Sequence, residues 1–246
     1  MADRAPTARA LARQAVHASI LAAARARLTE EGPSQLSLRA VARDVGMVSS
    51  AVYRYFPSRD DLLTALLIAD YDELGATVEA AEQAAAPAPG ARWVAVCRAI
   101  RTWSIAHPGD FALLFGSPVP GYVAPRATVE PASRTTLALV RVVADATADA
   151  SDVGSDGRRG SPTAPPTAPG MVADAVSAGV ASLREFGTEL PEEVLLRTLM
   201  AWTTVFGTVS FELFGHYVGS VSDGAAYFDE VIARLADDLG FTALFD

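Results

Sequence analysis

The chain has 246 residues, of which 50% are hydrophobic and 20% charged, a composition typical of a globular protein that excludes global disorder. Its formal net charge of −9 on its own argues against a nucleic-acid partner, but the charge is unevenly distributed. Residues 1–59 hold nine arginines against four acidic residues, whereas residues 60–246 hold eleven arginines against 25 acidic residues. This asymmetry indicates a nucleic-acid-binding end on an acidic body.

Cys97 is the single cysteine, so an internal disulfide is impossible and we expect a reducing, cytoplasmic location. We assign Cys97 to a helical core and give it no catalytic role. The longest charge-free apolar run, residues 198–211, is shorter than the roughly 20 residues that span a bilayer, so we expect no membrane partner.

Apolar residues recur at helical spacing from the start of the chain. One face of a first helix carries Leu11, Ala15, Ala18, Leu21, Ala22, Arg25 and Leu28, and the Gly32-Pro33 turn ends it. Ser37 is the expected N-cap of a second helix that Gly46 ends, and Ser49 the expected N-cap of a third that Pro57 ends. Ser58 and Asp61 form a capping box that opens a long fourth helix, reaching about residue 86.

The rest of the chain is also predicted to be helical, with prolines and glycines between the helices. We expect helices at about residues 92–107, 110–115, 133–150, 171–186, 192–217 and 224–239, a loop at 116–131 and a disordered insertion at 151–170. No strand pattern and no fixed-period repeat is evident, so the predicted fold class is all-α.

The segment 36–59 predicts a helix-turn-helix, in which two short helices join at a tight turn and the second enters the DNA major groove. Val41, Val45, Val52 and Phe56 are expected to pack inward, because such short helices are unstable alone. The opposite face then presents small polar residues and arginines that reach guanine edges or phosphates.

An ordinary amphipathic helix pair shows a similar pattern, but the ending Tyr53-x-x-Phe56-Pro57-Ser58-Arg59 before a capped long helix is more specific. Here the sequence resembles the TetR family of bacterial transcriptional regulators, whose N-terminal module commonly carries the pattern L-T-x-R-x-V-A-x-x-x-G-V-S-x-x-x-L-Y-x-H-F-x-x-K-x-x-L. The matching residues, within a resemblance that covers roughly 13–65, are Leu36, Ser37, Arg39, Val41, Ala42, Gly46, Met47, Ser49, Val52, Tyr53, Tyr55, Phe56, Arg59 and Leu62.

The resemblance implies a DNA-binding domain at residues 1–58, with its core at 13–58, and a role for each matching residue. Base edges are assigned to Arg39, Ser49, Ser50 and Ala51, joined by Arg54, and phosphates to Ser37, Tyr53 and Arg59. Val48 and Tyr55 complete the expected DNA-binding set, Tyr55 standing where the family often has histidine. Arg43 contacts phosphate or lies on a solvated helix face, and Arg4, Arg9 and Arg13 are expected to follow the DNA backbone as an arm.

The resemblance further implies that residues 59–246 form a helical ligand-binding and dimerisation domain. Candidate pocket residues are Trp103, His107, Phe111, Phe115, Tyr122, Met171, Trp202 and Phe206, although such aromatic stripes also occur in plain cores. His107 either lines this pocket or caps a helix end before Pro108. The runs 92–115 and 202–207 resemble a C-terminal subtype of these regulators named for Trp, His and Gly positions.

For the dimer, the last two helices are the expected pair, forming a four-helix bundle with those of a second copy. The expected interface residues are Met200, Gly207, Ser210, Phe211, Phe214, Phe228, Ile232 and Leu235. The three histidines lie far apart in the sequence, so neither a metal nor another cofactor is expected.

An enzyme is the main rival class, but the sequence lacks a nucleophile elbow, a zinc-protease motif and a phosphate loop, so we expect no catalysis. The predicted function is a sequence-specific DNA-binding regulator, most simply a repressor released from a pseudopalindromic operator by a small molecule. An activating or ligand-independent regulator of the same fold, or a small-molecule-binding helical protein without DNA binding, remains the alternative.

Overall fold

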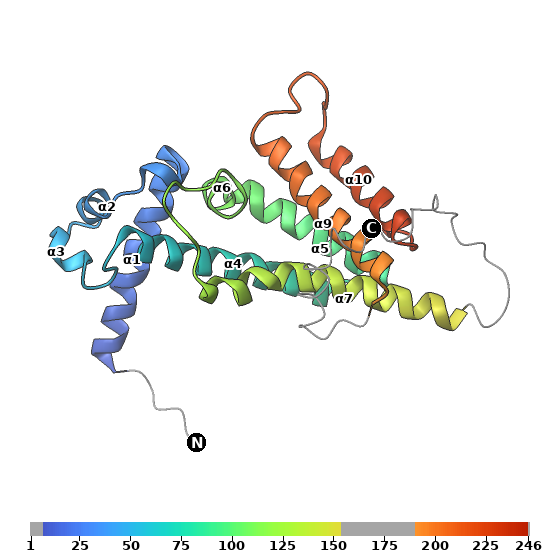
Figure 1. Ribbon diagram of the computed structural model, residues 1–246, viewed down its shortest axis with the longest axis horizontal. Coiled ribbons are helices and arrows are strands. Elements are labelled where there is room, and N and C mark those ends of the chain that lie inside the picture. Colours follow the sequence, from blue (N-terminus) through green and yellow to red (C-terminus); the bar gives the residue numbers. More distant parts are fainter. Residues whose placement is uncertain (1–6, 154–189, 246) are drawn as a thin grey trace. The chain divides into compact units, whose positions relative to one another are not determined.

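The computed structural model describes residues 7–153 and 190–245, and every regular element within them is a helix (Figure 1). The elements in chain order are α1 (Ala8–Glu31), η1 (Pro33–Gln35), α2 (Leu38–Asp44), α3 (Ser49–Val52), α4 (Arg59–Ala84), α5 (Pro89–Ala106), α6 (Pro108–Phe115), η2 (Arg126–Thr128), α7 (Val129–Val153), α9 (Glu192–Leu213) and α10 (Gly224–Asp238). The predicted all-α fold is confirmed.

Three predicted features lie wholly or mainly outside the described residues: the helix at 171–186, the pocket residue Met171 and most of the insertion at 151–170. Helix α7 continues through Val153, a few residues beyond the predicted start of the insertion at about residue 151. Pro131, placed in a loop by the sequence, lies in the first turn of α7, where a proline removes no helical hydrogen bond.

The chain divides into two compact units, Met1–Glu73 with Ser104–Ala132, and Leu74–Trp103 with Ser133–Asp246. The division falls inside α4 and not at the charge boundary near residue 59. The first half of α4 belongs to the first unit because its leucines, including Leu62, Leu63 and Leu66, are buried in the same core as α1 and α2.

The core of the first unit gathers apolar side chains from α1, α2, α3 and α4. Helix α1 contributes Ile20, Ala24 and Leu28, which follow one another at i, i+4 and i+8. The predicted stripe was therefore wrong at its start: Leu11 is 51% exposed, and Leu28 is the one member of that stripe that is buried in the core.

The turns of the first unit follow the sequence signals with one exception. Gly32 and Gly46 have φ values of 78° and 65°, which glycine adopts without steric cost. Ser37 is the N-cap residue of α2, as predicted. The N-cap of α3 is Val48, not Ser49, which is already the first residue of that helix, so the prediction for Ser49 was wrong.

Half of the capping box predicted before α4 is present, and the Asp61 carboxylate bonds the Ser58 hydroxyl in place of the Ser58 amide. The Ser58 hydroxyl accepts from the Asp61 amide at 3.1 Å and donates to the Asp61 carboxylate at 2.6 Å. Asp60 and Asp61 lie in the first turn of α4, where the helix dipole stabilises negative charge.

Helix α6 belongs to the first unit because its N-terminal end packs directly on α1. A Cβ added at Gly109 would lie 2.5 Å from Thr29 Oγ1 and 2.7 Å from Thr29 N, so only glycine permits this approach. Leu113, one helical turn later, is buried in the same core as the α1 residues.

The second unit is built from the C-terminal part of α4 with α5, α7, α9 and α10. Trp93 of α5 is fully buried, and its Nε1 donates to the carbonyl of Ile232 in α10 at 2.8 Å. Cys97 is also buried in α5, where desolvation raises the pKa of its thiol, as expected for a core cysteine.

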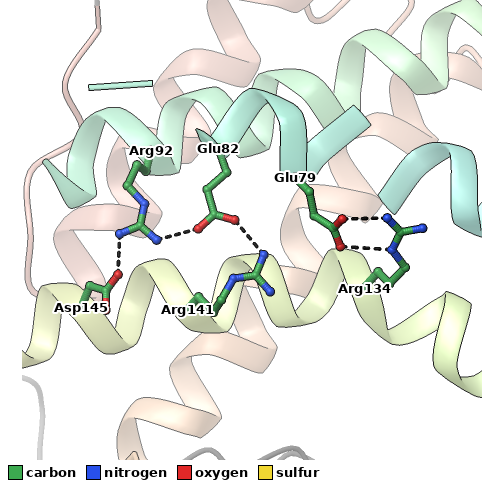
Figure 2. A network of polar contacts seen from close by, with 6 residues as sticks. All are labelled: Glu79, Glu82, Arg92, Arg134, Arg141 and Asp145. Atoms are coloured by element: carbon green, nitrogen blue, oxygen red, sulfur yellow. Dashed lines mark hydrogen bonds and ion pairs between the residues drawn. The ribbon is translucent and has the colours of Figure 1, made fainter. Parts of the chain in front are cut away.

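Ion pairs join α4 to α5 and α7 within this unit (Figure 2). Glu82, 8% exposed, accepts hydrogen bonds from Arg92 at 2.6 Å and Arg141 at 2.8 Å. Glu79 accepts a two-pronged hydrogen bond from Arg134, at 3.1 and 2.7 Å. The acidic C-terminal turns of α4 are thus fixed by arginines from two other helices.

Helix α9 is long and apolar enough to cross a membrane by length and composition alone. Core helices of soluble proteins meet the same criterion, so a single helix of this kind is weak evidence for a membrane protein. Leu195, Ala201, Val205 and Val209 of α9 are buried within the chain, as in a core helix.

Candidate DNA-binding surface

Helices α2 and α3 form a helix-turn-helix whose turn contains Gly46. The regular part of α3 is four residues long, and turn hydrogen bonds continue it, the Phe56 amide donating to the Val52 carbonyl at 3.0 Å. Val52 and Phe56 are 0% and 3% exposed in the core of the first unit. Tertiary packing therefore holds a helix too short to be stable alone.

Most of the predicted DNA-binding residues lie on the outside of this motif. Ser37, Arg39, Arg43, Val48, Ser50, Tyr53 and Arg54 are exposed, and Ser49, Ala51, Tyr55 and Arg59 are half-buried. Val48, at the N-cap of α3, is 71% exposed, and Tyr53 is 42% exposed. An apolar group and a phenol therefore reach solvent beside the arginines.

Three of the exposed arginines of this surface, Arg39, Arg43 and Arg54, make no ion pair or hydrogen bond with any described residue. In contrast, Arg27 of α1 is bound to Asp44 of α2 and lies 2.8 Å from Glu31. The charges of Arg39 and Arg54 are therefore uncompensated among the described residues and available to an anionic partner, whereas the charge of Arg43 also lowers the pKa of Asp44.

The predicted N-terminal arm is only partly described. Arg9 and Arg13 belong to the first turns of α1, so the predicted arm conformation was wrong for these two residues, and their contact with the DNA backbone stays a prediction. Arg13 lies over the Tyr55 ring, 5.8 Å from its centroid, a cation–π contact. Arg4 lies outside the described residues.

Arg59 points back to the segment before α2. Its Nε donates to the carbonyl of Leu36 at 2.9 Å, and its Nη2 donates to the carbonyls of Pro33 and Ser34 at 2.9 and 3.0 Å. The spacing of the motif did not predict these bonds, since they depend on how the two ends of the motif meet in space.

A cluster of charged residues joins α1, α4 and α6 inside the first unit. Arg25 of α1 donates to Asp70 Oδ1 at 2.9 and 2.5 Å, lies 3.0 Å from Glu73, and is 3.9 Å from Asp110 of α6. Asp70 Oδ2 and Asp110 Oδ1 are buried and have no hydrogen-bond partner among the described residues. Asp70 and Asp110 were not singled out by the sequence.

Burial dominates the electrostatics of this cluster. Desolvation, with the nearby Asp110 charge, raises the pKa of Asp70 from 3.8 to about 7, although Arg25 acts in the opposite direction. Burial also raises the pKa of Asp110, against the lowering effect of Arg25 and His107. One carboxyl group of the pair therefore binds a proton near neutral pH.

The predicted pocket residues fall into both compact units. In the first unit, the Phe111 and Phe115 rings lie 5.2 Å apart, and the Tyr122 hydroxyl is 2.9 Å from that of Thr64. His107 occupies the N-cap of α6, without a side-chain capping bond, and its Nε2 lies 3.5 Å from Glu73 Oε1.

In the second unit, the Trp202 and Phe206 rings lie 5.7 Å apart. Trp103 is 3% exposed and Phe206 is 7% exposed, and Phe111 of the first unit is fully buried. These three side chains contribute to the protein core, the alternative that their apolar spacing left open.

Helix α9 carries an exposed stripe at helical spacing. Met200, Phe211 and Phe214 are 53%, 52% and 47% exposed, and a Cβ at Gly207 would meet nothing within 4 Å. Ser210 lies beside this stripe and is half-buried.

The predicted dimer-interface residues of α10 were wrong at two of three positions. Phe228 and Ile232 are 1% and 0% exposed, packed within the second unit, and cannot offer their side chains to another molecule. Leu235 is half-buried. In the described part of the chain, no three His, Cys, Asp or Glu side chains gather as a metal-binding group.

Two family descriptions match the chain: "Bacterial regulatory proteins, tetR family" over residues 20–66 and "Tetracyclin repressor-like, C-terminal domain" over residues 93–235. The HTH-type transcriptional regulator Rv1816 of Mycobacterium tuberculosis is 38% identical over 224 residues, which cover 89% of each chain. Regulator Mb1846 of Mycobacterium bovis matches to the same extent.

Solved structures agree with these matches. Regulatory protein SCO4313 has a TM-score of 0.72 and 30% identity, covering 94% of this chain and 99% of its own. A tetR-family regulator from Streptomyces coelicolor, 17% identical with a TM-score of 0.61, covers 91% of this chain and 80% of its own and shares the fold. The chain belongs to the TetR family of bacterial transcriptional regulators, with a DNA-binding helix-turn-helix at its N-terminal end.

Proposed function

We propose that the protein is a dimeric, cytoplasmic repressor that binds a pseudopalindromic operator and leaves it when a small molecule binds. The observation that best supports this function is the outer face of α2 and α3, where Arg39 and Arg54 have no acidic partner among the described residues and Arg43 is exposed beside Asp44 without an ion pair. An exposed, unpaired basic face on a chain of net charge −9 is unusual unless an anionic partner covers it.

On this surface we assign base reading to the N-terminal end of α3 and to Arg39. In helix-turn-helix proteins, the first residues of the second helix contact base edges in the major groove. Ser49, Ser50 and Ala51 are small enough for close approach, and the exposed Val48 offers methyl groups to the thymine methyl. Arg39 has the planar fork that pairs with guanine O6 and N7.

Phosphate contacts are assigned to Ser37, Arg43 and Tyr53. All three side chains are exposed at the edge of the motif, and hydroxyl and guanidinium groups are common donors to phosphate oxygens. These contacts set the register of the protein on the duplex without reading its sequence.

The proposed dimer forms through the exposed stripe of α9. Met200, Gly207, Phe211 and Phe214 place large apolar surface around a glycine, so a second copy of α9 can approach closely at this point. A two-fold dimer places two recognition helices on one face of the duplex, which requires an operator with two related half-sites.

For the effector, we propose an aromatic-lined site beside α6 in the first unit, with Phe115, Tyr122 and His107 as its described members. The Tyr122 hydroxyl and the His107 imidazole are the polar groups there that can orient a ligand. A ligand that favours a state with misplaced recognition helices lowers operator affinity, by about 1–3 kcal/mol of coupling free energy.

The experiment is a titration of fluorescently labelled DNA from upstream of the gene, at several salt concentrations, with a scrambled duplex as the control. We expect tight binding to the upstream duplex that weakens steeply with salt, and a shifted base preference in Arg39→Gln. Equal affinity for the two duplexes refutes sequence-specific binding. A metabolite screen for release then tests the effector proposal.

A further inference from the structure

We infer that Arg59 is a positioning residue, which fixes the segment before α2 to the first turn of α4 and thereby orients α2 and α3 for DNA. This inference rests on the proposed function, because orientation matters only if α2 and α3 bind DNA. It departs from the phosphate contact expected from the sequence.

The contacts of Arg59 occupy most of its hydrogen-bonding capacity. A guanidinium has five N–H groups, and the Nε and both Nη2 hydrogens are directed to the carbonyls of Leu36, Pro33 and Ser34, all within 2.9–3.0 Å. The two N–H groups on Nη1 are not used in these bonds. Arg59 is also half-buried, unlike Arg39 and Arg54 of the outer face.

The Ser34 and Leu36 carbonyls, in and just after the short helix η1, Pro33–Gln35, need such a donor, whereas the Pro33 carbonyl also accepts the Leu36 amide at 3.5 Å. Carbonyl groups at the C-terminal end of a helix lack partners within the helix, and a basic side chain stabilises them by charge-assisted hydrogen bonds. The Arg59 side chain thus caps η1 from 23–26 residues away in the sequence.

The position of these bonds in the chain is what gives them an effect on the DNA-binding surface. Leu36 immediately precedes the N-cap of α2, and Arg59 is the first residue of α4, so the bonds close the segment that contains both α2 and α3. Leu36 and Phe56, at the two ends of this segment, are both buried in the core of the first unit. Arg59 adds directional polar bonds to that apolar anchoring.

Lysine cannot reproduce this arrangement. Its ammonium is a compact point charge on a flexible stem, whereas the planar guanidinium fork holds several acceptors in fixed directions. On a phosphate, in contrast, lysine and arginine both supply the charge that displaces a counterion. A positioning role and a phosphate-contacting role for Arg59 therefore predict opposite results for a substitution by lysine.

The test compares Arg59→Lys and Arg59→Met with Arg126→Met, which removes an exposed positive charge of the same unit outside the motif. For the full-length protein, operator affinity is measured across a salt series, and amide hydrogen exchange is measured in residues 36–58. We expect both Arg59 variants to lose about tenfold in affinity, with an unchanged salt slope and faster exchange in α2 and α3.

Wild-type affinity in Arg59→Lys, together with a salt slope lower by about 0.9 in Arg59→Met, overturns the inference and assigns Arg59 to a phosphate. If the wild-type protein shows no salt-dependent DNA binding, the proposed function fails separately. The exchange data then decide the positioning role: unchanged exchange in both Arg59 variants, relative to Arg126→Met, refutes it.

Discussion

The buried carboxyl group of Asp70 makes a prediction about how stability depends on pH. The pKa of Asp70 is raised from 3.8 to about 7 by burial and by the neighbouring Asp110. Between these two values, the folded protein holds a proton that the unfolded chain has released. The free energy of unfolding therefore falls as pH rises through this window, because the unfolded state binds fewer protons.

The size of the effect follows from the two pKa values. At about 1.36 kcal/mol for each pKa unit, a rise from 3.8 to about 7 corresponds to about 4 kcal/mol over the whole window. Of this, about 2 kcal/mol is lost between about pH 5.5 and pH 7. Asp110, whose pKa is also raised, acts in the same direction.

Asp70→Asn is the variant that isolates this effect. The amide oxygen still accepts the hydrogen bonds of Arg25, and Arg25 keeps Glu73 at 3.0 Å and Asp110 at 3.9 Å as its counter-charges. The variant resembles the protonated form and cannot ionise. We expect a flatter pH dependence and, at about pH 8, a higher free energy of unfolding than the wild type has.

The assay is urea unfolding followed by circular dichroism at a series of pH values between about 5.5 and 8. Asp44→Asn is the matched control, because the Arg27 hydrogen bond lowers the pKa of the exposed Asp44, which is ionised throughout this range. In this control, we expect the free energy of unfolding to depend on pH as it does in the wild type. A wild-type stability that rises with pH, or an Asp70→Asn slope equal to the wild type's, refutes the reasoning.

Four further substitutions test other contacts, each by a measured stability or mass. Glu82→Gln is expected to lower the free energy of unfolding by about 1–3 kcal/mol, because two arginines lose a buried carboxylate. Glu79→Gln, at a more exposed pair, is expected to lower it by about 1 kcal/mol or less. Equal losses in the two variants contradict this expectation. Gly109→Ala is expected to destabilise by about 1–3 kcal/mol through its clash with Thr29, and an unchanged urea midpoint contradicts it. Phe211→Asp is expected to convert a dimer into a folded monomer, seen by analytical ultracentrifugation, and a variant that stays dimeric removes α9 from the interface.

Local signals in the sequence predicted the elements of the first unit well. The Gly32 and Gly46 turns, the Ser37 N-cap and the Ser58–Asp61 capping bond depend on residues within three or four positions of one another. The helix-turn-helix was predictable for the same reason. The exception, Val48 in place of Ser49 at the N-cap of α3, is an error of a single residue in a very short helix.

Features that depend on distant partners were not predictable. Arg25 fell on the expected apolar face of α1, and nothing near it in the sequence indicates that Asp70 and Asp110 lie beside it. Likewise, Phe228 and Ile232 have the spacing of an amphipathic face, but spacing does not say whether the face packs inside the chain or against another copy. Only the tertiary structure separates these cases.

We propose that this acidic protein reads DNA as a two-fold dimer through α2 and α3. Selection of bound duplexes from a random pool by the purified full-length protein tests it most directly. We predict enrichment of one motif with two inverted half-sites, whose centres lie about one helical turn, or a multiple of it, apart. A pool that stays unenriched, or a motif without two-fold symmetry, contradicts the account.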